Sequence, residues 1–179
     1  MRSLILALAA ALALSLAAAT PAFAAMTLAS ADLTPGGVMP AKHIYPRCGG
    51  QNVSPQLTWS APPAGAKSLV LTMIDQDVKP HLWSHWVVVG LPPTAGAFTQ
   101  GAKALPAGAH GVASNFGDLG YAGPCPPPGT GVHHYRFTIW AMPSAEVAIG
   151  ADEKADALQA RLAKTAIDHA DLNVSVAAK

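Results

Sequence analysis

Charged and aromatic side chains are scarce in this sequence of 179 residues. Charged residues account for 12% of it, aromatic residues for 6%, and the formal net charge at pH 7 is +1. A chain with so little excess positive charge has no general electrostatic attraction to nucleic acid or to an anionic membrane surface. We therefore expect no nucleic-acid partner.

Familiar catalytic motifs are also missing. The sequence contains no nucleotide-binding glycine loop, no G-x-S-x-G elbow, no zinc knuckle and no H-E-x-x-H helix. Ser54 and Ser84 have no evident activating partner along the chain. Because no nucleophile–base pair can be identified in the sequence, we expect a protein that is not an enzyme.

Long apolar runs are absent after the first 24 residues, so no later segment is expected to cross a bilayer. The amino terminus combines Arg2, an apolar run over Leu4–Ala19 and an A-x-A pattern at Ala22–Ala24, which is typical of a secretory signal peptide. An uncleaved membrane anchor is the alternative, but the run is short for a span. We expect a signal peptide over residues 1–24, a single domain over residues 25–179, and a periplasmic or secreted protein.

Only two cysteines are present, Cys48 and Cys125. An exported protein meets an oxidising compartment, so the even count favours a disulfide between them. Closing so long a loop stabilises a fold by about 4 kcal/mol in the chain-entropy model. Two separate thiols are the alternative.

Glycine and proline, with 16 residues each, are abundant and indicate many shaped loops in a mostly β protein. The run over residues 67–75 is apolar on both faces and predicts a central strand covered on both sides. Residues 85–89 and 135–142 predict two further strands. We expect one helix over residues 153–165 and a last strand over residues 168–176.

The helix has a candidate N-cap in Asp152. A side-chain oxygen at this position accepts a backbone N–H that the first turn leaves free. Acidic residues near the start and basic residues near the end also suit the helix dipole.

Polar titratable groups gather where the predicted strands begin and end. Asp75 closes one strand, His85 opens the next, and His133 and Tyr135 follow a loop rich in glycine and proline. Successive side chains of a strand face opposite sides, so we expect His133 and Tyr135 to share a face and His134 to point away. Such a group could hold an anion, bind a metal through two histidines and an aspartate, or run acid–base catalysis. Histidines with purely structural roles in loops are the alternative.

Three motifs resemble the phosphatidylethanolamine-binding protein family, in its bacterial Raf-kinase-inhibitor-like branch. They are CGGQNVSPQLTW from residue 48, DQD from residue 75 with HWVVV from residue 85, and GYAGPCPPPGTGVHHYRF from residue 120. The resemblance implies a mainly β fold in which a large antiparallel central sheet packs on a smaller sheet, with a C-terminal helix. It also implies a small pocket for phosphate-like anions or phospholipid head groups, and a role as an inhibitor or modulator of another protein.

The resemblance implies ligand-binding residues at seven positions of this chain, and we expect no cofactor and no bound metal. They are Asp75, His85, Tyr121, Pro126, Pro127, His133 and Tyr135. A phosphoryl or ester hydrolase and a metal-binding protein are the alternative functions. The resemblance identifies neither a protein partner nor an oligomeric state, and a homodimer stays open.

One motif departs from the family pattern. The family's D-P-D-A-P reads Asp75-Gln76-Asp77-Val78-Lys79 here, so both prolines leave their places in the turn. Asp75 also poses an electrostatic problem, because a carboxylate repels a bound phosphate. Three resolutions are open: Asp75 orients His85 and keeps that imidazole charged, Asp75 is itself protonated, or the bound species carries few charges. We expect the first.

Overall fold

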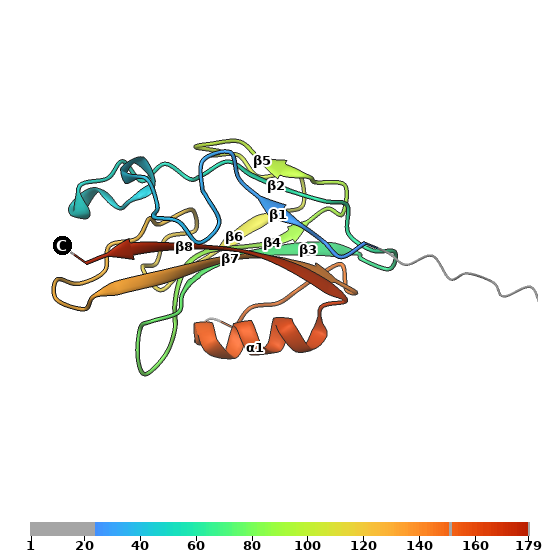
Figure 1. The fold of residues 1–179 in the computed structure, drawn as a ribbon. Coiled ribbons are helices and arrows are strands. Elements are labelled where there is room, and N and C mark those ends of the chain that lie inside the picture. Colours follow the sequence, from blue (N-terminus) through green and yellow to red (C-terminus); the bar gives the residue numbers. More distant parts are fainter. Residues whose placement is uncertain (1–23, 151, 179) are drawn as a thin grey trace, which may run out of the picture.

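The computed structural model describes residues 24–150 and 152–178 (Figure 1). The predicted signal peptide therefore lies, except for its last residue, outside the described residues. The elements in chain order are β1 (Leu28–Ala29), the 3-10 helices η1 (Ala41–His43) and η2 (Pro46–Cys48), β2 (Leu57–Trp59), β3 (Ser68–Asp75), β4 (Trp83–Leu91), β5 (Ala97–Phe98), β6 (His110–Val112), β7 (Val132–Met142), α1 (Ala155–Thr165) and β8 (Asp168–Ala177).

The strands form two antiparallel sheets. The large sheet has the order β6-β4-β3-β7-β8, and the small sheet has the order β1-β2-β5. Figure 1 shows the small sheet on one face of the large sheet and α1 on the other. The expected fold, mainly β with a large sheet on a small one and a C-terminal helix, is confirmed.

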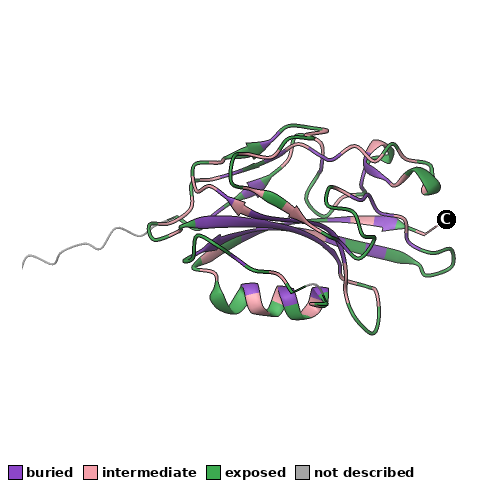
Figure 2. Ribbon diagram, turned by 180° about the vertical axis from the view of Figure 1, so that it is seen from behind, coloured by how far each residue is buried: buried purple, intermediate pink, exposed green. Residues whose placement is uncertain are grey.

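The strand β3 lies at the centre of the large sheet and is buried along its whole length (Figure 2). Leu71 and Met73 belong to the apolar core shared with the small sheet, whereas Val70 belongs to the core under α1. Side chains alternate along a strand, so a strand covered on both faces must be apolar at nearly every position. This is why the apolar run over residues 67–75 correctly predicts a central strand.

The helix α1 begins later than expected. It starts at Ala155 after Lys154, which makes no side-chain cap, so the prediction of Asp152 as N-cap was wrong. The chain instead makes a turn in which the Glu153 N–H donates to the Gly150 carbonyl at 3.0 Å. The Glu153 carboxylate then accepts from Arg161 at 2.7 Å, which ties this turn to the body of the helix.

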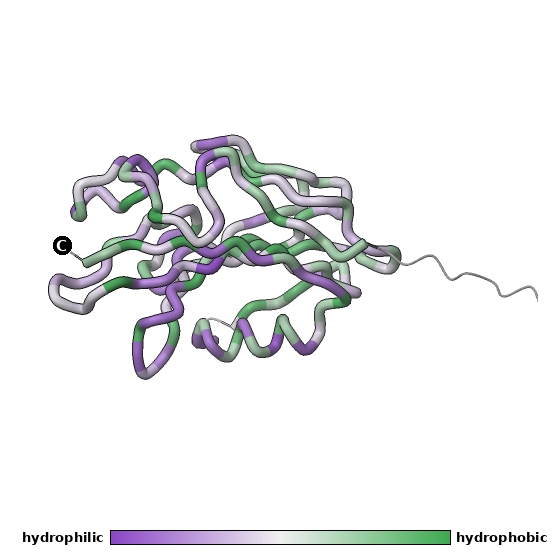
Figure 3. Tube along the Cα trace, in the orientation of Figure 1, coloured by the Kyte–Doolittle hydropathy of each residue, from purple (hydrophilic) through white to green (hydrophobic). Residues whose placement is uncertain are grey.

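The connection between β3 and β4 projects beside α1 and is mostly hydrophilic (Figure 3). Gln76 donates to Gln159 at 3.3 Å and His81 lies 3.3 Å from Asp156, so two contacts attach this connection to the helix. Within the described part of the chain, no helix has both the length and the apolarity needed to cross a membrane.

The two cysteines form a disulfide, with their Cα atoms 5.4 Å apart and 77 positions apart in sequence. The bond joins the end of η2 to the loop before β7. The prediction of a bridge between Cys48 and Cys125 agrees with the structure.

Candidate functional site

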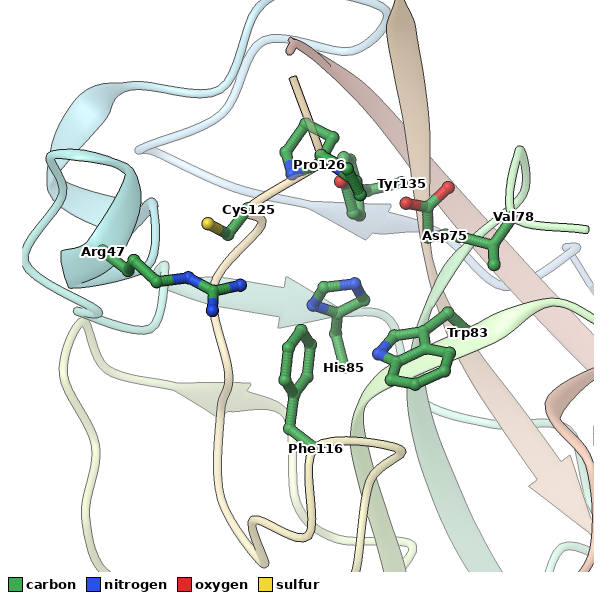
Figure 4. A pocket seen from close by; sticks show the side chains of 10 residues that line it. Arg47, Asp75, Val78, Trp83, His85, Phe116, Cys125, Pro126 and Tyr135 are labelled. Atoms are coloured by element: carbon green, nitrogen blue, oxygen red, sulfur yellow. The ribbon is translucent and has the colours of Figure 1, made fainter. Parts of the chain in front are cut away.

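A cavity of about 270 Å³ opens where β3 ends, beside the start of β4 and the early part of β7 (Figure 4). Two chemical kinds of residue surround it: apolar or aromatic side chains form most of the wall, and a few polar groups converge on it. The lining residues are Arg47, Asp75, Val78, Trp83, His85, Phe116, Cys125, Pro126, Pro127 and Tyr135.

Strand pairing brings the polar groups together. Asp75 is the last residue of β3 and lies opposite Tyr135 of β7. On the other side of β3 the register shifts so that Met73 faces Trp86 and Ile74 faces Ser84, which leaves His85 as the extra residue of a bulge. A bulge bends its strand and turns a side chain in a new direction. The geometry agrees with the expectation that Asp75 and His85 reach one edge of the sheet.

The partner of Asp75 is His133. Its carboxylate Oδ2 lies 2.7 Å from His133 Nδ1, and both side chains are almost fully buried. The other oxygen, Oδ1, accepts the backbone N–H of Asp77 at 2.9 Å. The expectation that Asp75 orients His85 was therefore wrong, because both carboxylate oxygens bind elsewhere.

The protons of this pair can be counted from its hydrogen bonds. The Thr130 hydroxyl has one proton and lies 2.7 Å from the Pro127 carbonyl, which can only accept. His133 Nε2, 2.8 Å from the same hydroxyl oxygen, must then be the donor. One further proton lies between Nδ1 and Asp75, so the Asp75–His133 pair is electrically neutral as a unit. A neutral pair does not repel a bound anion as a free carboxylate would.

His85 is held by a backbone carbonyl. Its Nδ1 donates to the Ala122 carbonyl at 2.8 Å. Burial lowers the pKa of His85 to about 4, against smaller opposing effects of that hydrogen bond and of the Asp75 charge. The expectation of a charged imidazole near neutral pH was therefore wrong. A neutral ring with its proton on Nδ1 leaves Nε2 as a hydrogen-bond acceptor.

Two hydrogen-bond donors of the cavity wall lack an acceptor within the described residues. They are the Tyr135 hydroxyl and the indole Nε1–H of Trp83, both buried. Burial, then the charge of the nearby Asp75 carboxylate and a polar contact with it that falls short of hydrogen-bond geometry, raises the pKa of Tyr135 far above its usual value, so the hydroxyl keeps its proton. Buried donors without acceptors are rare in folded proteins and suggest a bound group that accepts from them.

Five of the seven predicted ligand-binding residues line the cavity: Asp75, His85, Pro126, Pro127 and Tyr135. The other two have different surroundings. His133 lies behind Asp75 as its hydrogen-bond partner. Tyr121 donates to the His43 carbonyl at 2.7 Å and does not line the cavity. The expected alternation is observed, because His133 and Tyr135 are buried whereas His134 is exposed and contacts Asp77.

Sequence reasoning missed Arg47, Trp83 and Phe116. A usable signal existed for Arg47, because it precedes Cys48 and the predicted bridge to Cys125 places it next to the loop that carries Cys125. No comparable signal existed for Trp83 or Phe116. Among the described residues, no group of three or more His, Cys, Asp and Glu side chains is placed to hold a metal ion.

Comparison with known proteins places this architecture in a family. The family model described as "Phosphatidylethanolamine-binding protein" matches residues 29–177. The UPF0098 protein YbcL of Escherichia coli is 35% identical over 134 residues, which cover 70% of this chain and 73% of YbcL. LppC of Mycobacterium tuberculosis, named as a lipoprotein, is 46% identical over 130 residues, which cover 72% of this chain but only 62% of LppC.

Solved structures agree with the sequence comparison. The crystal structure of YbcL from E. coli has a TM-score of 0.77 and 31% sequence identity, and the match covers 87% of this chain and all of that one. CT736 from Chlamydia trachomatis has a TM-score of 0.68 and 32% identity, with coverage of 85% of this chain and 97% of CT736. A family model that spans nearly the whole described chain, relatives above 30% identity and a shared two-sheet fold together show that this chain belongs to the phosphatidylethanolamine-binding protein family.

Proposed function

We propose that this protein binds a small phosphate-like anion, either free phosphate or the phosphate of a phospholipid head group, in the cavity at the end of β3. The observation that carries the proposal is the pair of buried donors, the Tyr135 hydroxyl and Trp83 Nε1–H, which have no acceptor within the described residues. An oxyanion supplies several acceptor atoms in a small volume, whereas an apolar ligand leaves both donors unpaired at a cost of about 1–3 kcal/mol each.

The charges around the cavity agree with this ligand. The Asp75–His133 unit is neutral, and Arg47 at the cavity mouth is always protonated. His85 Nε2 is an acceptor, which a protonated phosphate oxygen can satisfy. Free phosphate, which still carries a P–OH proton near pH 7, can satisfy this acceptor directly. The phosphodiester of a phospholipid head group has no such proton, so it fits only if its binding adds a proton to His85.

Our proposal includes no catalytic step. A chain of hydrogen bonds does join Asp75, His133 and the Thr130 hydroxyl, as in a nucleophilic triad. However, the Thr130 proton is donated to the Pro127 carbonyl, so the histidine is a donor to this hydroxyl rather than its base. We expect no turnover of chromogenic phosphate or acyl esters, and turnover that His133→Ala abolishes would contradict this expectation.

We also propose that the protein is exported to the periplasm or beyond the cell. Three observations support this proposal: the signal-peptide pattern of residues 1–24, the Cys48–Cys125 disulfide, and a relative named as a lipoprotein. Fractionation of cells that express the full chain, followed by mass determination of the mature amino terminus, tests it directly.

Two tyrosine variants test the anion proposal. Tyr135→Phe removes a buried hydroxyl that has no partner in hydrogen-bond geometry within the described residues, so phosphate affinity measured by titration calorimetry should fall roughly 10- to 100-fold without loss of stability. Tyr121→Phe removes a hydroxyl that is already bonded to the His43 carbonyl. It should lower the free energy of unfolding by about 1 kcal/mol and leave phosphate affinity unchanged. Equal affinities for the wild type and Tyr135→Phe, or no binding of phosphate and phosphoethanolamine at all, would overturn the proposal.

A further inference from the structure

Arg47 differs from the other arginines that the structure describes. Arg136 lies 3.9 Å from Asp171 and Arg161 lies 2.7 Å from Glu153, whereas no carboxylate of the described residues lies within 4.0 Å of Arg47. Figure 4 shows its side chain reaching from η2 toward the cavity that His85 and Phe116 line. The guanidinium therefore brings a positive charge to the cavity mouth that no acidic side chain compensates.

The backbone that carries Arg47 is attached to the cavity wall at several points. The next residue, Cys48, is bonded to Cys125, which itself lines the cavity. Two residues before Arg47, the Tyr45 N–H donates to the Pro124 carbonyl at 3.0 Å. The Tyr45 ring also stacks on Phe116, with ring centroids 5.8 Å apart and planes 11° apart.

Close backbone approach supports the same attachment. A Cβ added at Gly123 would lie 2.3 Å from the His43 carbonyl oxygen and 2.8 Å from the Tyr45 nitrogen. The segment before η2 and the loop that carries Cys125 are thus packed main chain against main chain. Although Arg47 is exposed, its backbone is fixed relative to the cavity by a covalent bond, a hydrogen bond and a ring stack.

We propose that Arg47 is an anion-binding residue of this cavity and that the Cys48–Cys125 disulfide holds it there. The proposal rests on the proposed anion binding and identifies the group that supplies the positive charge. Since His85 is neutral near pH 7 and Asp75–His133 is neutral as a unit, Arg47 is the permanent cation among the lining residues. A guanidinium offers two parallel N–H donors that match two oxygens of a phosphate.

The first test separates Arg47 from other surface arginines. Arg47→Gln should weaken phosphate binding roughly 10- to 100-fold and make the affinity less sensitive to salt. Arg136→Gln, which changes the same residue type on the opposite side of β7 from Tyr135, should leave both properties unchanged. Arg47→Lys should recover only part of the affinity, because an ammonium lacks the planar pair of donors.

The second test asks whether the disulfide acts through Arg47. The double variant Cys48→Ser/Cys125→Ser should bind phosphate more weakly than the wild type, and this loss should disappear in the Arg47→Gln background. A purely structural disulfide would lower stability but would not show this coupling. If the double variant does not fold, a glycine inserted between Arg47 and Cys48 keeps the bridge, moves the arginine, and should weaken binding to the level of Arg47→Gln.

The outcomes distinguish this inference from the function on which it rests. Phosphate binding by the wild type with undiminished affinity in Arg47→Gln overturns the role of Arg47 but leaves the anion proposal standing. Equal losses from bridge removal in the wild-type background and in the Arg47→Gln background overturn the positioning role of the disulfide alone. A wild-type protein that binds neither phosphate nor phosphoethanolamine overturns both proposals.

Discussion

The neutral state of His85 predicts that the cavity discriminates phosphate from sulfate at pH 7. The two anions have the same tetrahedral shape, but phosphate keeps a P–OH proton at this pH and sulfate has none. Because His85 donates Nδ1–H to the Ala122 carbonyl, its Nε2 presents a lone pair to the ligand. A phosphate can donate to that lone pair, whereas a sulfate oxygen would face it without a proton between them.

The size of the effect follows from two routes that are open to sulfate. Protonating His85 at pH 7, with a pKa of about 4, costs about 4 kcal/mol at 1.36 kcal/mol per pH unit, before the field of the anion reduces the cost. Leaving Nε2 unpaired against a sulfate oxygen costs about 1–3 kcal/mol. The cheaper route dominates, so sulfate should bind roughly 5- to 150-fold more weakly than phosphate.

Titration calorimetry with both anions checks this prediction. As the pH falls from 7 to about 4.5, part of His85 becomes imidazolium, its Nε2–H can donate, and the preference for phosphate should narrow. Sulfate that binds through the charged ring must take up a proton, which shows as a binding enthalpy that depends on the buffer. His85→Gln should reduce the preference because an amide can turn either its donor or its acceptor toward the ligand. Equal affinities for the two anions at pH 7, without proton uptake, would refute the assignment of a neutral His85.

Two further predictions concern other parts of the molecule. Gly123→Ala should lower both stability and phosphate affinity, because the new Cβ would lie within 3 Å of the backbone of the segment before Arg47. In the control Gly120→Ala the new Cβ meets nothing within 4 Å, so the unfolding temperature and the phosphate affinity by calorimetry should both stay unchanged. Burial alone would raise the pKa of Asp32, but hydrogen bonds from three partners outweigh it and lower the pKa to about 2. Asp32 should therefore contribute on the order of 1 kcal/mol that is present above about pH 4 and lost as the pH falls toward 2, and chemical unfolding across this range should show no such loss in Asp32→Asn.

The strands that build the cavity were predictable because their burial leaves a local pattern. A strand covered on both faces must be apolar throughout, which made β3 readable from residues 67–75. Strict alternation placed His133 and Tyr135 on one face of β7. Both conclusions depend only on neighbouring residues, and this is why they agree with the structure.

The partner of Asp75 was not predictable in the same way. His85 and His133 both reach the end of β3, and the choice between them depends on a register shift in β4. That shift aims His85 at a backbone carbonyl and leaves His133 to bind the carboxylate. A bulge of one residue has no distinct composition in this sequence. We therefore expected a raised pKa for His85, whereas the structure lowers it. Arg47 was missed for a related reason, since its place at the cavity depends on a bond between distant residues.

The altered turn after β3 shows why the geometry of Asp75 can survive the loss of both family prolines. The Asp77 N–H donates to Asp75 Oδ1 at 2.9 Å, which closes a turn through a side chain rather than through a proline ring. The Asp77 carboxylate in turn accepts the His134 backbone N–H at 2.6 Å, so the turn is tied to β7. The Asp75 carboxylate is therefore held at Oδ1 by the Asp77 N–H and at Oδ2 by His133. The altered motif changes the lining of the cavity rather than the position of Asp75, because the turn places the apolar side chain of Val78 in the cavity wall.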